Sequence, residues 1–319
     1  MKILILGGAG FIGYHLACKL SDIKGRYVEI VDNFQRGRKD EYFKKLLKKK
    51  NVKFNKLNLL NEKEILKLKL NFDYIFFLSA IVGVKNVVSN PYDVLHKNTV
   101  MTINAINFAK KNKKLKRFIF FSTSEVYSGS IGTNFFKIPT KENTKICLNE
   151  FNDSRSTYML SKIYGENLCH HSQLNYTILR PHNFYGPRMG MSHVIPEKLK
   201  EIAKKENKRV KVFSPNNTRT FIYIDDAIEI INKLAFKKST NKKTFNIGNE
   251  KPEYKILDLV KLCMKVVGIK KEIILSKNKD KILRRAPSLK YTNKFVKYKN
   301  KFNLEKGIIQ TYLWYKKNF

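Results

Sequence analysis

The sequence contains few cysteines, and none of them forms a metal-binding or redox motif. The four cysteines, Cys18, Cys147, Cys169 and Cys263, stand far apart along 319 residues. Without a Cys-x-x-Cys pair or dense spacing, neither a zinc site nor a disulfide framework is predicted. We therefore expect no metal centre and interpret the thiols as small apolar residues.

Long apolar runs are also absent. No stretch approaches the roughly 18 consecutive apolar residues of a membrane span. The apolar run from Ile3 to Leu6 is broken by glycine too early for a signal peptide. The sequence therefore predicts a cytoplasmic protein with no membrane partner.

Acidic residues are scarce, since 26 Asp and Glu face 64 Lys and Arg, for a formal net charge of +38. Such a field attracts polyanions whatever the fold. The excess of positive charge comes from lysine, which is spread over nearly every predicted helix and loop. Arginine, whose planar guanidinium is better suited to phosphate, is sparse. We interpret the charge as a composition bias and expect no nucleic-acid partner, although an acidic substrate would still benefit from the field.

Short apolar strands alternate with helices in the first half of the chain. This alternation is typical of a parallel sheet covered on both faces. The predicted fold class is α/β, with a doubly wound parallel sheet of the Rossmann type and a smaller C-terminal substrate domain. The expected strands are Ile3–Leu6, Tyr27–Val31, Tyr74–Leu78 and Arg117–Phe121, and the expected helices are Phe11–Leu20 and about Val100–Lys111.

A helical pattern over about Ser156–Ser172 and a strand at Asn175–Leu179 complete this regular part. Beyond them the chain is less regular and richer in Lys and Pro. We predict a dinucleotide-binding domain over residues 1–174, with returning segments near 218–248, and a mainly substrate-binding domain over 175–319.

Three glycines directly after the first predicted strand have the spacing of a dinucleotide-binding loop. Gly7 makes the tight turn, Gly10 lets the backbone approach a pyrophosphate, and Gly13 permits close contact between helix and strand. The helix that begins with Phe11 and Ile12 points its N-terminal N–H groups at the phosphates. The alternative, a simple glycine turn, is disfavoured by the position between a strand and a helix.

An acidic residue, Asp32, ends the second predicted strand about twenty residues beyond the glycine loop, as in dinucleotide-binding proteins. A carboxylate there accepts hydrogen bonds from the adenosine ribose and repels a 2′-phosphate. Asp32 therefore favours NAD over NADP, while the nearby Arg36 and Arg38 could serve a 2′-phosphate and keep NADP as the alternative. The alternative role for Asp32 is that of a strand-end turn residue.

Tyr158 and Lys162 lie one helical turn apart on the same face of a predicted helix. A tyrosine, with a pKa of about 10, becomes a useful base only when a cation stabilises its phenolate. The pair alone is common in a chain rich in both residues. Thr123 and Glu125 strengthen the catalytic interpretation of this pair. They follow a buried strand at the edge of the sheet where ligands bind in open α/β folds.

Thr123 is placed to hydrogen-bond a hydroxyl that is being oxidised, and Glu125 to move a proton on the neighbouring carbon. The alternative is a polar strand end at which Glu125 starts a helix.

These residues resemble those of the extended short-chain dehydrogenases/reductases, specifically the NAD-dependent epimerase/dehydratase family that acts on nucleotide sugars. The resemblance covers essentially the whole chain. It rests on the glycine loop at 7–13, Asp32-Asn33, the stretch 77–80 with Asn98, the stretch 122–127, Tyr158 with Lys162, the stretch 179–188, Asp225-Asp226 and Asn246-Ile247-Gly248.

The resemblance implies a role for each catalytic residue. Tyr158 takes the proton of the sugar C4 hydroxyl while hydride passes to the nicotinamide, Lys162 holds the ribose and lowers the tyrosine pKa, and Thr123 orients the sugar. Further NAD contacts are implied for Asn33, Asn58, Leu59, Leu78, Ala80 and Asn98, and substrate contacts for Ser124, His182, Asn183, His193, Val194, Arg219 and Arg285.

Arg219 and Arg285 look like the phosphate-binding arginines of the substrate side, because guanidinium forks suit a diphosphate. Surface ion pairs are the alternative for both. Asn183 would contact the substrate diphosphate. His182 and His193 are substrate candidates, with packed or surface histidines as the alternative.

Three residues depart from the pattern of the family. Ser124 gives Thr-Ser-Glu where sugar dehydratases of this family carry Thr-Asp-Glu, and this is more similar to the nucleotide-sugar decarboxylases. Asn58 replaces an aspartate near the adenine, and Ser288 replaces an aspartate after Arg285. The stretch 189–196 and His182 do not match the decarboxylases, so the subgroup stays open.

The function that the sequence predicts is oxidation of a nucleotide-hexose C4 hydroxyl by NAD to a 4-keto intermediate, followed by epimerisation or dehydration. The alternatives are a decarboxylase of the UDP-glucuronate type, a C4 dehydrogenase, and, from another class, a non-catalytic NAD-binding or polyanion-binding protein. The resemblance also implies a homodimer.

Overall fold

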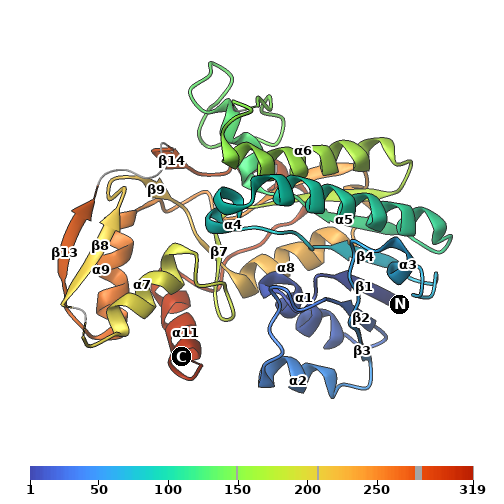
Figure 1. The fold of residues 1–319 in the computed structure, drawn as a ribbon, viewed down its shortest axis with the longest axis horizontal. Helices are drawn as coiled ribbons and strands as arrows, with labels where there is room; N and C mark the ends of the chain where they lie inside the picture. The colour runs from blue at the N-terminus through green and yellow to red at the C-terminus, as the bar shows by residue number, and fades with distance from the viewer. Residues whose placement is uncertain (149, 207, 277–281, 319) are drawn as a thin grey trace. The chain divides into compact units, whose positions relative to one another are not determined.

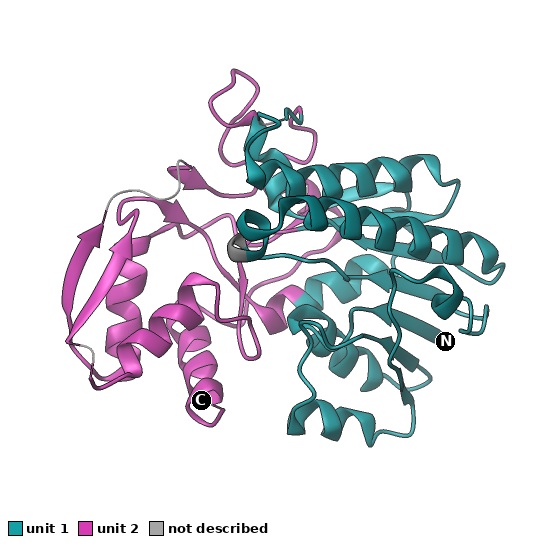
Figure 2. Ribbon diagram, viewed as in Figure 1, with its two compact units in different colours: residues 1–129, 146–180, 228–245 teal, residues 130–145, 181–227, 246–319 magenta. Residues whose placement is uncertain are grey.

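The computed structural model describes residues 1–148, 150–206, 208–276 and 282–318, and its chain forms two compact units (Figure 2). Each unit is assembled from separate segments of the chain. Residues 218–227, which we predict to return to the first domain, lie in unit 2. The first domain is predicted to end at residue 174, whereas unit 1 also includes residues 175–180. Unit 1 comprises residues 1–129, 146–180 and 228–245, and unit 2 comprises residues 130–145, 181–227 and 246–319.

Unit 1 is built on a seven-stranded sheet with the order β11-β6-β5-β4-β1-β2-β3 (Figure 1). Every pair from β6 to β3 is parallel, which confirms the predicted α/β class. The strand order reverses between β1 and β4. Ligands of doubly wound sheets bind at such a reversal, beside the carboxyl ends of the strands. The strands are β1 (Lys2–Leu6), β2 (Tyr27–Val31), β3 (Val52–Asn55), β4 (Tyr74–Phe77), β5 (Arg117–Phe121), β6 (Tyr176–Pro181) and β11 (Lys243–Ile247).

Helices cover both faces of this sheet, with α5 and α6 side by side on one face (Figure 1). On the other face α1 is tied to the middle of α8 by an ion pair between Lys19 and Glu229. The helices are α1 (Phe11–Ser21), α2 (Glu41–Leu47), α3 (Glu62–Ile65), α4 (Val84–Ser89), α5 (Pro91–Lys111), α6 (Ser154–His171) and α8 (Ile224–Ala235), with the 3-10 helices η1 (Ser124–Ser130) and η2 (Lys238–Thr240).

Two sequence predictions for this unit need correction. The helix α5 begins at Pro91 rather than near Val100, because proline is well accommodated in the first turn, where its missing N–H has no partner to lose. The strand β3 was not predicted, since it is only half-buried and carries no continuous apolar run.

The core of unit 1 lies between the sheet and the pair α5 and α6. Phe77 of β4 stacks on the rings of Phe118 and Phe120 of β5, and all three side chains are fully buried. Ala105 and Phe108 of α5 belong to the same cluster. Burial of each large side chain contributes about 1.5–3 kcal/mol, so this layer fixes α5 and α6 on β5.

Unit 2 contains short strands joined by helices. β9 lies between β12 and β14, β8 pairs with β13, and β7 pairs with β10. The strands are β7 (Phe184–Tyr185), β8 (Arg209–Phe213), β9 (Thr218–Arg219), β10 (Ile222–Tyr223), β12 (Tyr254–Lys255), β13 (Glu272–Ser276) and β14 (Arg284–Arg285), and the helices are α7 (Val194–Ala203), α9 (Ile256–Val267), α10 (Lys290–Phe295) and α11 (Leu304–Lys316).

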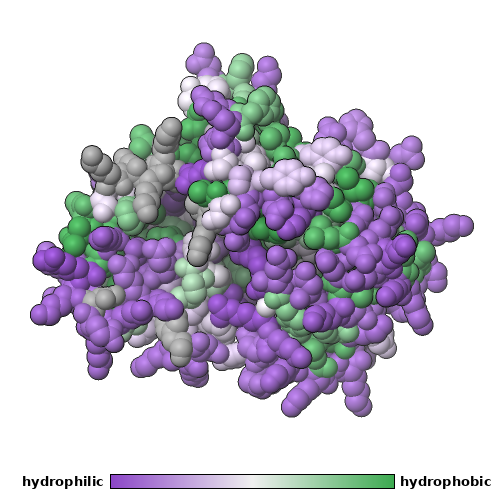
Figure 3. Space-filling view, in the orientation of Figure 1, coloured by the Kyte–Doolittle hydropathy of each residue, from purple (hydrophilic) through white to green (hydrophobic). Residues whose placement is uncertain are grey.

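Within the described residues, no helix combines the length and the apolar character that a membrane crossing requires. The same residues include no cluster of His, Cys, Asp and Glu side chains suited to a metal ion. Hydrophilic side chains are spread over the visible surface rather than gathered over one element (Figure 3). This spread agrees with an excess of lysine distributed along the chain.

Candidate functional site

The glycine loop is packed too closely to accept larger residues. A Cβ atom on Gly13 would lie 2.3 Å from the Gly7 carbonyl oxygen, and one on Gly7, whose φ is +88°, would lie 2.8 Å from the Ser79 nitrogen. The first turn of α1 therefore sits directly on the loop, and the loop sits against the end of β4. The N–H groups of α1 consequently face the carboxyl edge of the sheet, where an anionic pyrophosphate is stabilised.

The carboxylate of Asp32 at the end of β2 is tied to this loop. Its two oxygens accept the N–H groups of Ala9 at 3.0 Å and Phe34 at 2.8 Å. Desolvation raises the pKa of Asp32, and hydrogen bonds from the backbone of Phe34, Ala9 and Gly10 oppose this rise. A carboxylate fixed beside a glycine loop is suited to bind ribose hydroxyls, so loop and carboxylate together fit NAD.

The predicted cofactor residues after β4 lie beside the loop. The Leu78 N–H donates to the Leu6 carbonyl at 2.8 Å, which places Leu78 and Ala80 next to the carboxyl end of β1. Asn98 of α5 is buried, and its amide both accepts from the Ile81 N–H at 2.7 Å and donates to the Ile81 carbonyl at 3.0 Å. Asn98 thus fixes the course of the chain behind Ala80.

Three other predicted cofactor residues have local roles in the structure. The side-chain oxygen of Asn33 accepts from the Gln35 N–H at 2.9 Å, and that of Asn58 accepts from the Leu60 N–H at 3.1 Å. Leu59 is buried in the core of unit 1. Asn33 and Asn58 therefore shape the turns after β2 and β3, while Leu59 anchors the second turn.

The structure brings Thr123 and Tyr158 together. The Thr123 hydroxyl hydrogen-bonds to the Tyr158 phenol, and it also accepts from the Glu125 N–H at 3.2 Å. Desolvation raises the pKa of Tyr158 to about 12, the bond from Thr123 and the charge of Arg36 lower it, and the charge of Glu125 raises it. The phenol is therefore protonated at neutral pH until further positive charge comes close.

Lys162 supplies a cation one turn further along α6. Its side chain is buried, and the ammonium donates to the Phe121 carbonyl at 2.8 Å and lies 5.1 Å from the centre of the Phe120 ring. Desolvation lowers the pKa of Lys162 to about 8, although the neighbouring Glu166 opposes this. Lys162 therefore carries its proton at neutral pH but releases it more readily than an exposed lysine does.

In unit 2, the two predicted phosphate-binding arginines are direct neighbours. Arg219 of β9 stands opposite Arg285 of β14 in the parallel register, so both side chains leave the same face. The Arg219 guanidinium donates to the Thr218 carbonyl at 2.7 Å and the Ile282 carbonyl at 2.9 Å. These bonds to neutral carbonyls orient the guanidinium and do not cancel its charge.

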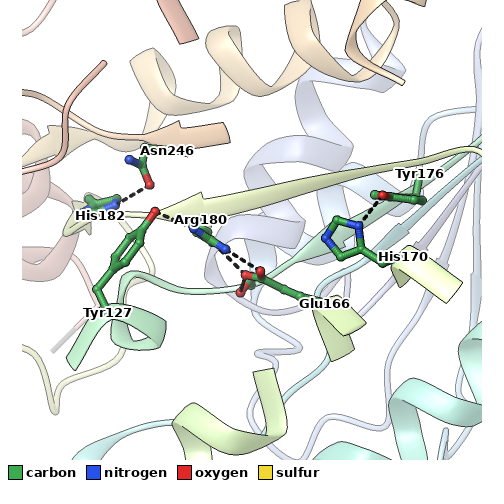
Figure 4. Close-up of polar contacts among 8 residues, drawn as sticks. Tyr127, Glu166, His170, Tyr176, Arg180, His182 and Asn246 are labelled. Atoms are coloured by element: carbon green, nitrogen blue, oxygen red, sulfur yellow. Dashed lines mark hydrogen bonds and ion pairs between the residues drawn. The ribbon is translucent and has the colours of Figure 1, made fainter. Parts of the chain in front are cut away.

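The remaining predicted substrate residues of unit 2 lie on either side of β7. Asn183 has a φ of 45°, and its amide donates to the Thr220 carbonyl at 2.9 Å. His182 is buried, and its Nε2 lies 3.1 Å from the side-chain oxygen of Asn246 (Figure 4). His193 precedes α7, which begins with Val194. Ser124, by contrast, lies in unit 1 and is the first residue of η1.

A buried polar network that was not predicted from the sequence lies beside the residues predicted for catalysis. Arg180, at the end of β6, forms a double hydrogen bond with Glu166 of α6 and a further one with the hydroxyl of Tyr127 (Figure 4). The spacing of Glu166, one turn beyond Lys162, was the available signal. Its partner Arg180 could not be inferred from spacing, because the pair depends on the packing of α6 against β6.

Comparison with known proteins identifies the family of this chain. The family model of the NAD dependent epimerase/dehydratase family matches residues 3–248. The UDP-N-acetyl-alpha-D-glucosaminuronate decarboxylase of Bacillus cytotoxicus is 30% identical over 99% of this chain and 98% of its own.

Two solved structures cover all of this chain. The UDP-glucuronic acid 4-epimerase of Bacillus cereus, in complex with UDP-glucuronic acid and NAD, has 26% identity, a TM-score of 0.86 and 100% of its own chain covered. The UDP-glucose 4-epimerase of Thermotoga maritima, with UDP-glucose, has 26% identity, a TM-score of 0.85 and 99% of its own chain covered. This chain is an enzyme of the NAD-dependent epimerase/dehydratase family, its cofactor is NAD, and its chemistry is that of the nucleotide-sugar short-chain dehydrogenases/reductases.

Proposed function

We propose that the protein oxidises the C4 hydroxyl of a nucleotide hexose to a 4-keto intermediate and carries this intermediate on to epimerisation or dehydration. The observation that carries the proposal is the contact between the Thr123 hydroxyl and the Tyr158 phenol, with the buried ammonium of Lys162 one helical turn away. A protein that only binds NAD has no use for this combination of a hydroxyl, a base and a cation.

The glycine loop and Asp32 would hold NAD, which would supply the acceptor for the C4 hydride and the donor for its return. The chain's own residues handle the proton. Tyr158 removes the proton of the C4 hydroxyl, while Thr123 holds that oxygen by a hydrogen bond. Because the pKa of Tyr158 is raised to about 12 with Lys162 already in place, the phenolate needs further positive charge, which the nicotinamide ring of NAD would supply.

The second step depends on the proton at C5, which becomes acidic once C4 is a ketone. Glu125, the second residue after Thr123, is proposed to accept or return this proton. Epimerisation at C4 needs no such step, because the ketone only has to receive the hydride on its other face. Dehydration requires loss of the C5 proton and of the C6 hydroxyl, which departs as water.

A decarboxylase is the second candidate, and Ser124 is the observation that favours it. If the sugar is a uronate, the C5–C6 bond of the 4-keto form breaks, carbon dioxide leaves, and the bonding electrons pass toward the C4 carbonyl. That route needs no acid at position 124, where this chain has a hydroxyl. The Bacillus cytotoxicus relative is named for a decarboxylase of this type. A C4 dehydrogenase that releases its ketone is the third route.

On the substrate side, we propose that Arg219 and Arg285 bind the diphosphate, supported by their adjacent positions in β9 and β14. Asn183 would assist them, while Ser124, His182, His193 and Val194 would contact the rest of the nucleotide sugar. A homodimer through α5 and α6 is proposed as well, since Tyr92 and Tyr164 of these helices are exposed. A cytoplasmic role in polysaccharide biosynthesis would suit this chemistry.

The test is incubation with UDP-, GDP-, CDP- and dTDP-sugars in deuterated water, followed by chromatographic separation of the epimers and mass spectrometry of each product. A C4 epimer has the mass of its substrate and carries no deuterium. Loss of water or of carbon dioxide with deuterium at C5 identifies a dehydratase or a decarboxylase. If no sugar reacts and the protein instead binds RNA or DNA in a salt-sensitive manner, the polyanion-binding alternative replaces the proposal.

A further inference from the structure

Three polar side chains follow one another along a single face of α6. Tyr158, Lys162 and Glu166 are spaced by four residues each, so they stack at successive turns of the helix. Lys162 and Glu166 are buried, and Glu166 has only 5% of its surface exposed. The helix therefore presents a base, a cation and an anion in one row.

Each member of this row contacts a residue at the end of β5, and these partners are consecutive in the chain. The Phe121 carbonyl accepts the ammonium at 2.8 Å, the Ser122 hydroxyl donates to the carboxylate, and the Thr123 hydroxyl meets the phenol. One stretch of three residues thus fixes three turns of helix. Ser122 is the chain neighbour of Thr123, so its hydrogen bond to Glu166 connects the segment that contacts the phenol to the buried carboxylate.

The carboxylate of Glu166 is held in turn by Arg180 at the end of β6. The guanidinium donates from Nε at 2.9 Å and from Nη2 at 2.6 Å to the two carboxylate oxygens, and from Nη1 to the Tyr127 hydroxyl at 2.7 Å (Figure 4). Burial lowers the pKa of Arg180, but the hydrogen bonds and charge of Glu166 outweigh it and raise the pKa. The guanidinium of Arg180 therefore stays charged.

A buried pair of this kind contributes little net stability over apolar residues of the same size. Its two parallel hydrogen bonds do impose geometry, because a planar fork and a carboxylate tolerate only one arrangement. Here the fork connects the carboxyl ends of β5 and β6 to α6. A small shift of α6 along its axis would break both hydrogen bonds and would separate the phenol from Thr123.

We propose that Ser122, Glu166, Arg180 and Tyr127 are positioning residues that hold α6 at the register on β5 where Thr123 meets Tyr158. This inference rests on the proposed C4 oxidation, which needs the phenol at a fixed distance from the sugar hydroxyl. The network itself does not touch the reacting atoms.

The first measurement needs no substrate. Carbon-13 labelling of the tyrosine rings gives an NMR signal for Tyr158 in the NAD-loaded protein, identified by its loss in Tyr158→Phe. Glu166→Gln is expected to move this signal, because the phenol loses its fixed contact with Thr123. The matched control is Arg117→Met, which removes another buried arginine, bound to the Thr177 hydroxyl at 2.8 Å, at the opposite end of β5.

The second measurement uses a nucleotide sugar that the wild-type protein converts. Glu166→Gln and Arg180→Lys are expected to lower kcat by about 10- to 100-fold, since a misplacement near 1 Å costs about that much, and to leave KM within a few-fold. Arg180→Lys keeps the charge and loses only the fork. If Glu166→Gln does not fold, Ser122→Ala provides the same test by deleting one hydroxyl.

An unchanged Tyr158 signal in Glu166→Gln, or an equal change in Arg117→Met, would overturn the positioning role. A wild-type protein that converts no sugar would instead overturn the proposed function, and the NMR comparison would still decide the inference. An equal loss of kcat in Arg117→Met would show that stability rather than register is responsible.

Discussion

The two units use their polar side chains in different ways. In unit 1 the residues proposed for catalysis contact one another, as the Thr123 hydroxyl does with the Tyr158 phenol. In unit 2 the residues proposed for the substrate are held by main-chain carbonyls, as Arg219 is by those of Thr218 and Ile282. The proposed chemistry therefore depends on side chains of α6 and of the segment directly after β5. The proposed binding of the diphosphate depends on arginines of the short strands β9 and β14.

The contrast is tested most strongly by Tyr158→Phe. Removing the hydroxyl deletes the proposed base, and we expect the sugar-dependent appearance of NADH absorbance to fall by about 10²–10⁴-fold while NAD stays bound. Thr123→Val should cause a smaller loss, because it removes only a hydrogen bond. Unchanged turnover in Tyr158→Phe would rule out the proposed mechanism.

On the substrate side, Arg219→Ala should act on binding rather than on the chemical step. A charge-assisted hydrogen bond contributes about 1.5–3 kcal/mol, so KM should rise by about 10- to 100-fold with little change in kcat. The control is Arg284→Ala, whose side chain is half-exposed and paired with Glu253. A loss confined to kcat would show that unit 2 contributes to the chemistry as well.

Within unit 1, Gly13→Ala should weaken the binding of NAD by displacing α1 from the glycine loop. Its Cβ would lie 2.3 Å from the Gly7 carbonyl oxygen, so α1 must move away from the loop. Overpacking of this kind costs about 1–3 kcal/mol, and calorimetry should show weaker NAD binding. Gly25→Ala is the control, because its Cβ would meet nothing within 4 Å even though its φ is +79°. Equal NAD affinity in the two variants would contradict the assignment of the loop.

The smallest expected effect concerns stability. The pKa of the buried Lys162 falls from 10.5 to about 8, so its charged form costs about 3 kcal/mol near pH 7. Lys162→Met loses the hydrogen bond to Phe121, worth about 1 kcal/mol, and should still raise the free energy of unfolding by about 1–2 kcal/mol.

The sign of the pH dependence checks this prediction. The unfolded chain holds the lysine proton up to pH 10.5, whereas the folded chain releases it from about pH 8. The wild-type protein therefore gains stability relative to Lys162→Met as the pH rises through this interval, and the difference in urea unfolding should shrink. A gap that is constant from pH 7 to pH 10 would show that the ammonium is not desolvated.

Much of unit 1 could be predicted from the sequence because its signals are local. The glycine spacing, the apolar strands β1, β2 and β5, and the pair Tyr158 and Lys162 on one helical face each depend on residues close together in the chain. The start of α5 was misplaced because its first turns carry polar residues that give no apolar period. The half-buried β3 was missed for a similar reason.

By itself, the sequence determined the doubly wound class, the dinucleotide loop and the identity of the residues proposed for catalysis, since each depends on local spacing and side-chain chemistry. Only the tertiary structure decided which polar groups meet. Arg180 reaches Glu166 because β6 packs beside β5 under α6, and Arg219 stands opposite Arg285 because β9 and β14 pair in one register. Such contacts join residues distant in the chain, and no local pattern encodes their partner.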